Sequence, residues 1–139
     1  MCADHWAPYT DDPATIATPP PTDAYANATH HKLTVYQGVP QSMDFMTSCL
    51  AQGHGFVIGF TAYESFFQTG PDGVVPPPSG GVAGGHSVWV CGFDPVRDLF
   101  RFQNSWSDTW GQQGYGWMSA AVLTNPNLSA DFWTARVQK

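Results

Sequence analysis

The chain has 139 residues, of which 42% are hydrophobic and 14% aromatic, a composition that argues against disorder and favours one globular unit. Eleven acidic and five basic residues give a formal net charge of −6, which argues against the clustered cations that a nucleic-acid partner needs. Charged residues make up only 12% of the chain, below the roughly 25% usual in globular domains, so we expect an apolar face that something covers.

Residues 1–31 open the chain as a proline-rich arm. Five prolines lie within residues 1–22, where each fixes the backbone φ angle, removes an N–H donor and pushes the residue before it towards an extended conformation. We expect this arm to be irregular and to lie over another part of the protein.

The next two elements are a short strand and a helix. Residues 32–39 place apolar side chains at mostly two-residue spacing and predict the strand. Ser42 is a suitable helix cap, apolar residues follow at helical spacing, and Gly53 is a suitable stop. We therefore predict a helix over about residues 43–52.

An apolar, β-favouring run over residues 56–63 predicts a central strand, and residues 64–67 are expected to turn the chain. Residues 70–85 contain a triple-proline run and two Gly-Gly pairs, which predict a long loop. Further strands are predicted over residues 87–91, 99–103, 115–118 and 132–137. No membrane-length apolar segment is present, so a membrane partner is not expected. Together these elements predict an α+β domain, built on a mainly antiparallel sheet that rolls into a partial barrel.

His86 and Asn104 are the candidate catalytic pair. His86 opens one strand of a predicted hairpin and Asn104 follows the other, so pairing of the two strands brings both side chains together. An asparagine oxygen that accepts one imidazole N–H holds the ring in a single tautomer without adding charge. The second ring nitrogen then faces a nucleophile. A lone histidine is more often a packing or surface residue, but the glycines before it and the Asn-Ser-Trp after it favour the catalytic interpretation.

Three segments carry a family resemblance: Gly84-Gly85-His86 before an apolar strand, Asn104-Ser105-Trp106 after its partner, and the Trp-Gly-x-x-Gly-Tyr run over residues 110–115. In order and spacing they resemble the histidine and asparagine region of papain-like cysteine peptidases. Further similarity, to microbial members, lies in residues 6–9, 63–66 and 131–133. The resemblance thus covers nearly all of residues 1–139 and implies the C-terminal half-domain of that fold, which bears the histidine and the asparagine.

The resemblance implies a role for several side chains. His86 is the base and later the acid, Asn104 orients it, and Trp106 covers their hydrogen bond from water. Trp110 lines the leaving-group side of the cleft, and Ser107 replaces the glycine usual after Asn-Ser-Trp. In such an enzyme the imidazolium lowers the pKa of a cysteine thiol, and the thiolate attacks a peptide carbonyl.

The substrate implied by the resemblance is a peptide or a protein. Gly59 and Gly85 are expected to border the pocket that reads one of its side chains. No cofactor is implied, and the other histidines lack metal-ligand spacing, so we expect no metal site.

The nucleophile of this family lies in a Cys-Gly-Ser/Ala-Cys-Trp motif about 130 to 150 residues before the His and Asn. Neither that motif nor its partnering oxyanion-hole glutamine occurs in the sequence. Cys2, Cys49 and Cys91 lack CxxC spacing and an oxyanion setting, so packing is the expected role of each. We therefore expect half of a peptidase, inactive alone, that needs a Cys-bearing N-terminal domain or chain. The alternative is a catalytically inactive papain-fold module that binds a peptide or protein in its cleft.

Overall fold

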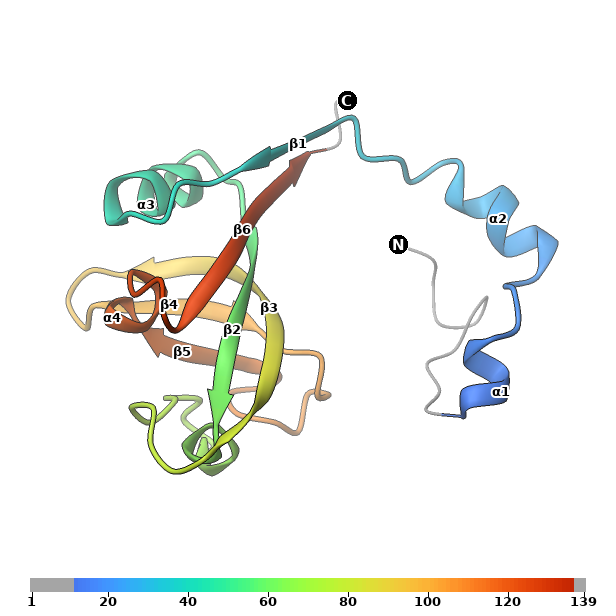
Figure 1. The fold of residues 1–139 in the computed structure, drawn as a ribbon. Coiled ribbons are helices and arrows are strands. Elements are labelled where there is room, and N and C mark those ends of the chain that lie inside the picture. Colours follow the sequence, from blue (N-terminus) through green and yellow to red (C-terminus); the bar gives the residue numbers. More distant parts are fainter. Residues whose placement is uncertain (1–11, 137–139) are drawn as a thin grey trace. The chain divides into compact units, whose positions relative to one another are not determined.

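The computed structural model describes residues 12–136, drawn in colour in Figure 1. By their contacts these residues divide into two compact units, the first made of residues 12–35 with Arg136 and the second of Tyr36–Ala135. Among residues 12–136, no helix is long and apolar enough to cross a membrane.

The first unit contains two short helices, α1 (Pro13–Ile16) and α2 (Thr22–Ala28). The Asp12 side chain caps α1 by accepting two backbone N–H groups of its first turn, and Pro21 directly precedes α2. We expected an irregular arm over residues 1–31, and in these two segments the structure differs. Prolines that stand before or within a first helical turn need no N–H partner there, so they start these helices instead of breaking them. Residues 1–11 of the arm lie outside the described residues.

An open, six-stranded antiparallel sheet forms the framework of the second unit (Figure 1). Two of its residues, Val35 and Arg136, are counted with the first unit. The strand order is β1-β6-β2-β3-β4-β5. The strands are β1 (Val35–Gly38), β2 (Phe56–Tyr63), β3 (Val82–Asp94), β4 (Leu99–Gln103), β5 (Tyr115–Ser119) and β6 (Ser129–Arg136). The predicted α+β fold with a mainly antiparallel sheet is confirmed.

Three helical segments accompany the sheet: α3 (Met43–Ala51), the 3-10 helix η1 (Glu64–Gln68) and α4 (Ala120–Leu123). The predicted helix over residues 43–52 is α3, although the Ser42 side chain makes no capping hydrogen bond. Helix α4 was not predicted, since four residues are too few to show a helical period. All three segments contribute side chains to the same core as the sheet.

One face of the sheet carries the core. Alternate residues of β2, β3, β4 and β5 point to this face, as the two-residue strand period requires. Burial of each large side chain stabilises the fold by about 1.5–3 kcal/mol. The most deeply buried large side chains are Phe56, Phe100, Phe102, Met46, Ile58, Leu123 and Val90.

Strand β3 begins earlier than the sequence indicated. Residues 82–85, assigned to the long loop, pair with β2 through Tyr63↔Val82, Ala62↔Gly84 and Thr61↔Gly85. The loop prediction is wrong for these residues, because the glycine pair accommodates an irregularity in the ladder opposite Ala62 instead of ending it. The longer strand places His86 inside β3, opposite Phe60 of β2.

Candidate active site

The β3–β4 hairpin brings His86 and Asn104 together, as predicted. His86 lies on β3, and Asn104 follows the last residue of β4 directly. The distance between His86 Nε2 and Asn104 Oδ1 is 2.8 Å. Asn104 is only 8% exposed, and its backbone N–H donates to the carbonyl of Gly114 at 2.9 Å. The orienting amide is therefore fixed by the backbone as well as by its side chain.

A second contact of Asn104 Oδ1 shows which ring nitrogen of His86 carries the proton. This oxygen also accepts the backbone N–H of Ser105 at 2.9 Å, which identifies it as the oxygen of the amide. Because an oxygen can only accept, His86 Nε2 must carry the proton of the 2.8 Å hydrogen bond when the imidazole is neutral. The lone pair is then on Nδ1, the nitrogen available to a reacting group.

Aromatic rings surround the imidazole. The ring centroids of Phe60 and Phe66 each lie 5.7 Å from that of His86, and the centroid of Trp106 lies 5.0 Å away. Trp106 is where the resemblance placed it, beside the His86–Asn104 pair. Rings of this kind lower the local dielectric and strengthen the hydrogen bond that they cover.

Phe66 and Phe67 were not predicted as site residues. Both belong to η1, where Phe66 is 2% exposed and Phe67 is 61% exposed. Phe67 stacks on Trp106 with 5.6 Å between centroids and 15° between planes. The signals in the sequence are the similarity of residues 63–66 to microbial family members and the aromatic pair after the central strand, and neither shows which ring the pair will contact.

Trp110, expected to line the leaving-group side of the cleft, lies beside Trp106. Its ring contacts are with Phe66, Phe102 and Trp106, and it packs against the core while partly exposed. These contacts place Trp110 next to Trp106, so it supports that ring.

The connection from Asn104 to Gly114 carries both tryptophans and an unusual backbone conformation. Ser107, which stands where the family usually has glycine, has a φ of 72°. A side chain in this left-handed region costs about 1–2 kcal/mol, which accounts for a glycine there in relatives. The Ser107 hydroxyl hydrogen bonds to Thr109 Oγ1 at 2.8 Å and its oxygen accepts the Thr109 N–H at 3.4 Å, so the replacement adds two local contacts.

Gly59 and Gly85 lie on the sheet face opposite that of Phe60, because Gly59 pairs with Ser87 and Thr61 pairs with Gly85. Gly59 borders a hollow of about 180 Å³ that residues 126–131 complete. Gly85 is not among the residues that line it. The hollow contains one ionisable side chain, Asp131, which sequence reasoning did not single out.

The cysteines of the described chain are placed as packing residues. Cys49 is buried in α3, and its thiol donates to the carbonyl of His54 at 3.4 Å. Cys91 lies half-buried in β3, where burial raises the pKa of its thiol and the nearby Arg101 guanidinium opposes that effect more weakly. Cys2 lies outside the described residues. Within residues 12–136, no group of three or more His, Cys, Asp or Glu side chains is arranged to hold a metal ion.

Comparison with known proteins identifies relatives of this arrangement. The chain resembles xylellain, a cysteine protease from Xylella fastidiosa, with a TM-score of 0.87 and 32% identity over 99% of this chain and 57% of that one. A peptidase C1-like protein of Acanthamoeba polyphaga mimivirus is 30% identical over 96% of this chain and 46% of its own length. Cathepsin B-like cysteine proteinase 5 of Caenorhabditis elegans is 31% identical over 66% of this chain and 26% of its own length.

The chain thus spans about half the length, or less, of these relatives. The model of the papain family of cysteine proteases matches residues 2–131, which is nearly the whole chain. With that match, and with a fold shared with a cysteine protease, the chain belongs to the papain family of cysteine proteases.

Proposed function

We propose that this chain supplies the histidine base and the orienting asparagine of a papain-like cysteine peptidase, which hydrolyses peptide bonds. The observation that carries the proposal is the 2.8 Å contact between His86 Nε2 and Asn104 Oδ1. Because Ser105 also fixes that oxygen, Nδ1 of His86 keeps its lone pair for a proton.

The reaction that this geometry supports has two proton transfers. His86 Nδ1 accepts the proton of a cysteine thiol, and the resulting thiolate attacks the carbonyl carbon of the peptide bond. The imidazolium then donates that proton to the leaving amine, while Asn104 holds the ring in place. Water later releases the acyl group from the cysteine, with His86 again as the base.

The thiol has to come from outside the described cysteines. Cys49 is buried with its thiol bound to a carbonyl, and burial raises the pKa of Cys91. Neither has the exposed, electropositive setting that activates a cysteine. We therefore propose that a Cys-bearing domain or chain provides the nucleophile and the oxyanion-hole glutamine, and that residues 1–139 alone do not cleave peptides.

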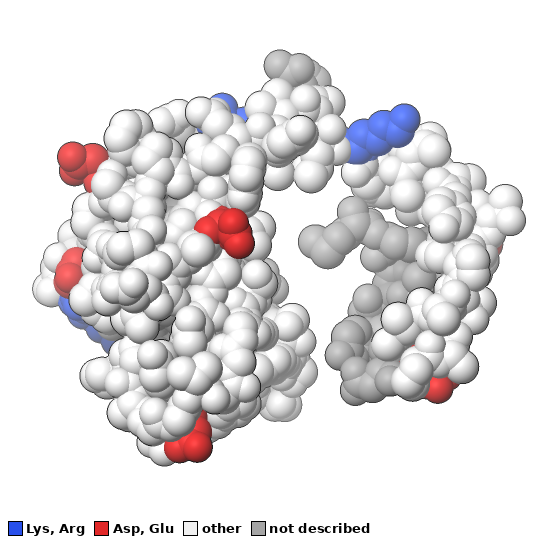
Figure 2. Space-filling view, in the orientation of Figure 1, with Lys and Arg blue, Asp and Glu red and all other residues white. Residues whose placement is uncertain are grey.

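The sheet face opposite that of His86 carries exposed apolar side chains that could be covered in an assembly, apart from the site where the thiol must reach the imidazole. Val57 pairs with Trp89 of β3 and with Trp133 of β6, so the three side chains form a row across adjacent strands, on the face that also carries Gly59. They are 44%, 44% and 47% exposed. We call Val57, Trp89 and Trp133 the aromatic row. Figure 2 shows only scattered charged side chains on the face of residues 36–135 that it draws, in keeping with a surface that is not solvated by charge.

One buried polar atom of the site is left without a hydrogen bond within residues 12–136. Asn104 Nδ2 is buried and has no hydrogen-bond partner among the described residues. An unsatisfied buried donor costs about 1–3 kcal/mol, so the amide that faces His86 is held in place at a cost to stability.

Reconstitution tests the proposal. The chain is mixed with the Cys-bearing half of a related papain-like protease, and hydrolysis of a fluorogenic peptide is measured beside sedimentation velocity. We expect turnover only in the mixture. His86→Ala should lower it by at least about 10²–10⁴-fold while leaving assembly intact, because it removes the general base. Asn104→Ala should slow it less, by loosening the imidazole.

His54→Ala is the matched control, since His54 lies at the end of α3, outside the site. It should leave both assembly and turnover unchanged. Assembly without turnover, at any ratio of the two parts, would instead support the inactive papain-fold binding module. A monomer that ignores the added domain would contradict the half-enzyme proposal.

A further inference from the structure

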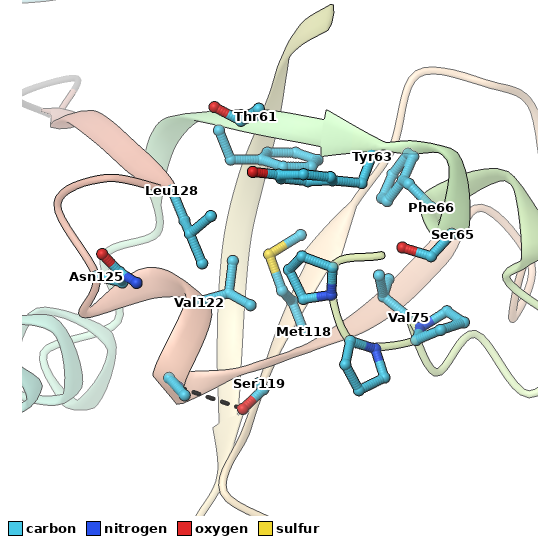
Figure 3. Close-up of a pocket in the computed structure, with 15 residues that line it drawn as sticks. Thr61, Tyr63, Ser65, Phe66, Val75, Met118, Ser119, Val122, Asn125 and Leu128 are labelled. Atoms are coloured by element: carbon cyan, nitrogen blue, oxygen red, sulfur yellow. Dashed lines mark hydrogen bonds between the residues drawn. The ribbon is translucent and has the colours of Figure 1, made fainter. Parts of the chain in front are cut away.

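A second cavity, drawn in Figure 3, shares two of its lining rings with the surroundings of His86. It has a volume of about 420 Å³, within the range of about 300–1,000 Å³ typical of ligand pockets. Phe60 and Phe66 line it, and both rings also contact the His86 imidazole. His86 is not among the lining residues, so the cavity is a site separate from the catalytic pair.

The lining of the cavity disfavours a charged ligand. None of its 15 lining residues carries a charge. Ring faces and aliphatic groups dominate, from η1, β2, the triple-proline segment of residues 76–78, α4 and the connection to β6. A charged ligand would lose its hydration here without gaining a partner, whereas a flat apolar ring would lose little.

Several hydrogen-bond donors that line the cavity have no acceptor among residues 12–136: the hydroxyl groups of Thr61, Tyr63, Ser65 and Ser119, and Asn125 Nδ2. Figure 3 shows the Tyr63 ring extending across it, with the hydroxyl directed towards the side of Leu128 and Asn125. Neither the Tyr63 hydroxyl nor Asn125 Nδ2 hydrogen bonds to another of residues 12–136. Ser65 Oγ accepts the Ser79 N–H at 3.0 Å and Ser119 Oγ accepts the Ala121 N–H at 3.2 Å, so these two hydroxyl groups are engaged as acceptors and keep their O–H for a ligand. A ligand with one acceptor therefore has donors to meet.

We propose that this cavity binds a small, uncharged aromatic molecule with a single carbonyl acceptor, held between the rings of Tyr63 and Phe66 and the prolines. A peptide segment fits less well, because each of its backbone N–H and C=O groups would need a partner and the lining consists mostly of rings and aliphatic groups.

Binding at this cavity is coupled to the imidazole. The Phe66 ring is 2% exposed and contacts Phe60 at 5.2 Å, Trp106 at 5.3 Å and Trp110 at 5.6 Å between centroids. In a closely packed cluster, a ring that moves to admit a ligand forces its neighbours to repack. The ligand would thus shift the environment of His86. Only its consequence for turnover rests on the proposed peptidase function; binding does not.

The test is a titration of the full chain, carrying 13C-labelled histidine and methyl groups, with acetophenone as the probe. We expect saturable shifts of the Val122, Leu128 and Met118 methyl signals together with the His86 imidazole signal. Benzoate has the same ring with a charge and should give no saturable shift. Equal binding of benzoate and acetophenone, or no saturation with acetophenone, would overturn the proposal.

Tyr63→Phe keeps the ring and removes the hydroxyl. It should weaken acetophenone binding by about fivefold to tenfold while leaving toluene binding unchanged. Tyr36→Phe, on the 75% exposed tyrosine of β1, is the matched control and should change neither. Unchanged acetophenone binding in Tyr63→Phe would contradict the assigned orientation.

One further outcome identifies a different occupant. If the Cys-bearing half of a related protease shifts the same methyl signals and excludes acetophenone, the cavity receives a side chain of that domain and the small-molecule assignment is wrong. All these readouts are made without substrate, so they stand whether or not His86 proves catalytic.

Discussion

Phe67 and Trp106 stack at 5.6 Å with 15° between their planes, although Phe67 is 61% and Trp106 36% exposed. Two large rings that keep this much surface in solvent form a ready apolar platform beside the His86–Asn104 pair. Since Trp106 also contacts His86, the platform lies next to the proposed reaction centre.

Loss of the platform should weaken substrate binding more than chemistry. In the reconstituted peptidase we expect Phe67→Ala to raise KM by about twofold to tenfold for peptides with an apolar residue after the scissile bond, and to leave kcat within twofold. Steady-state kinetics with two such peptides measure this. Phe45→Ala, on a similarly exposed ring of α3, should change neither constant. A fall in kcat with unchanged KM would assign Phe67 to support of the imidazole.

Ser107→Gly should stabilise the chain by about 0.5–1 kcal/mol. Relief of the left-handed conformation contributes about 1–2 kcal/mol, and the greater freedom of glycine in the unfolded chain offsets about 0.5–1 kcal/mol of it. The measurement is the urea midpoint, compared at an unchanged slope. Ser105→Gly, at a residue outside the positive-φ set, is the control and should be destabilising. Destabilisation by both substitutions would mean that the hydroxyl contact to Thr109 outweighs the backbone strain.

Cys91 should react slowly with iodoacetamide at neutral pH, because burial raises the pKa of its thiol. Peptide mapping of labelled chain against pH gives the rate for this cysteine separately from the others. The rate should rise only above the pH at which an ordinary thiol ionises. The unfolded chain then loses this proton first, so the free energy of unfolding falls as pH rises through that range. Fast labelling of Cys91 at pH 6 would contradict both statements and reopen its assignment as a packing residue.

Asp131 should set a preference for cationic side chains. It lies in the hollow bordered by Gly59, and a Cβ at Gly59 would approach the Asp131 Cβ at 4.0 Å. In the reconstituted peptidase, Asp131→Asn should reduce kcat/KM for peptides with Arg at the discriminating position by about tenfold, and leave peptides with Leu unchanged. Asp108→Asn, on the exposed Asn104–Gly114 connection, is the matched control. If Asp131→Asn leaves kcat/KM unchanged for both peptides, the hollow does not bind the discriminating side chain of the substrate.

The aromatic row should cause the lone chain to self-associate. Replacing both Trp89 and Trp133 with Gln should weaken that association by at least about tenfold, since each indole removes apolar area from water when covered. Sedimentation velocity over a range of concentrations measures it. Val96→Gln, which changes a 93% exposed residue outside the row, should have no effect. A lone chain that stays monomeric at all concentrations would show that the aromatic row does not drive self-association.

The sequence anticipated the elements whose signal is local. β2 and β4 have the predicted bounds because each is a short run rich in apolar, β-favouring residues, and in the fold alternate residues of each run are buried. The start of β3 was missed because its Gly-Gly pair has the composition of a loop, while its pairing with β2 depends on a partner distant in sequence. Helix α4 was too short to be recognised, and α2 was hidden by the prolines before it.

The candidate site also combines features that have a local sequence signal with features that depend on tertiary packing. The His86–Asn104 contact followed from a hairpin and a motif, both of which the sequence displays. Phe66 had no comparable signal, since its place among several rings arises only when η1 folds back against β3 and the Asn104–Gly114 connection. Tertiary packing of this kind leaves no periodic pattern of apolar residues in the sequence.

The connection from Asn104 to Gly114 is closed at its base by the hydrogen bond from Asn104 N–H to Gly114 O at 2.9 Å. A surface loop closed in this way is anchored by its stem, and its tip is free to change in length and composition. The tip over residues 107–109 is therefore the replaceable part of this connection, whereas Trp106 is held by its ring contacts, Trp110 by the core and the orienting amide by the sheet. Loop grafting from relatives between residues 107 and 109 offers a route to altered selectivity that leaves the proton-transfer geometry in place.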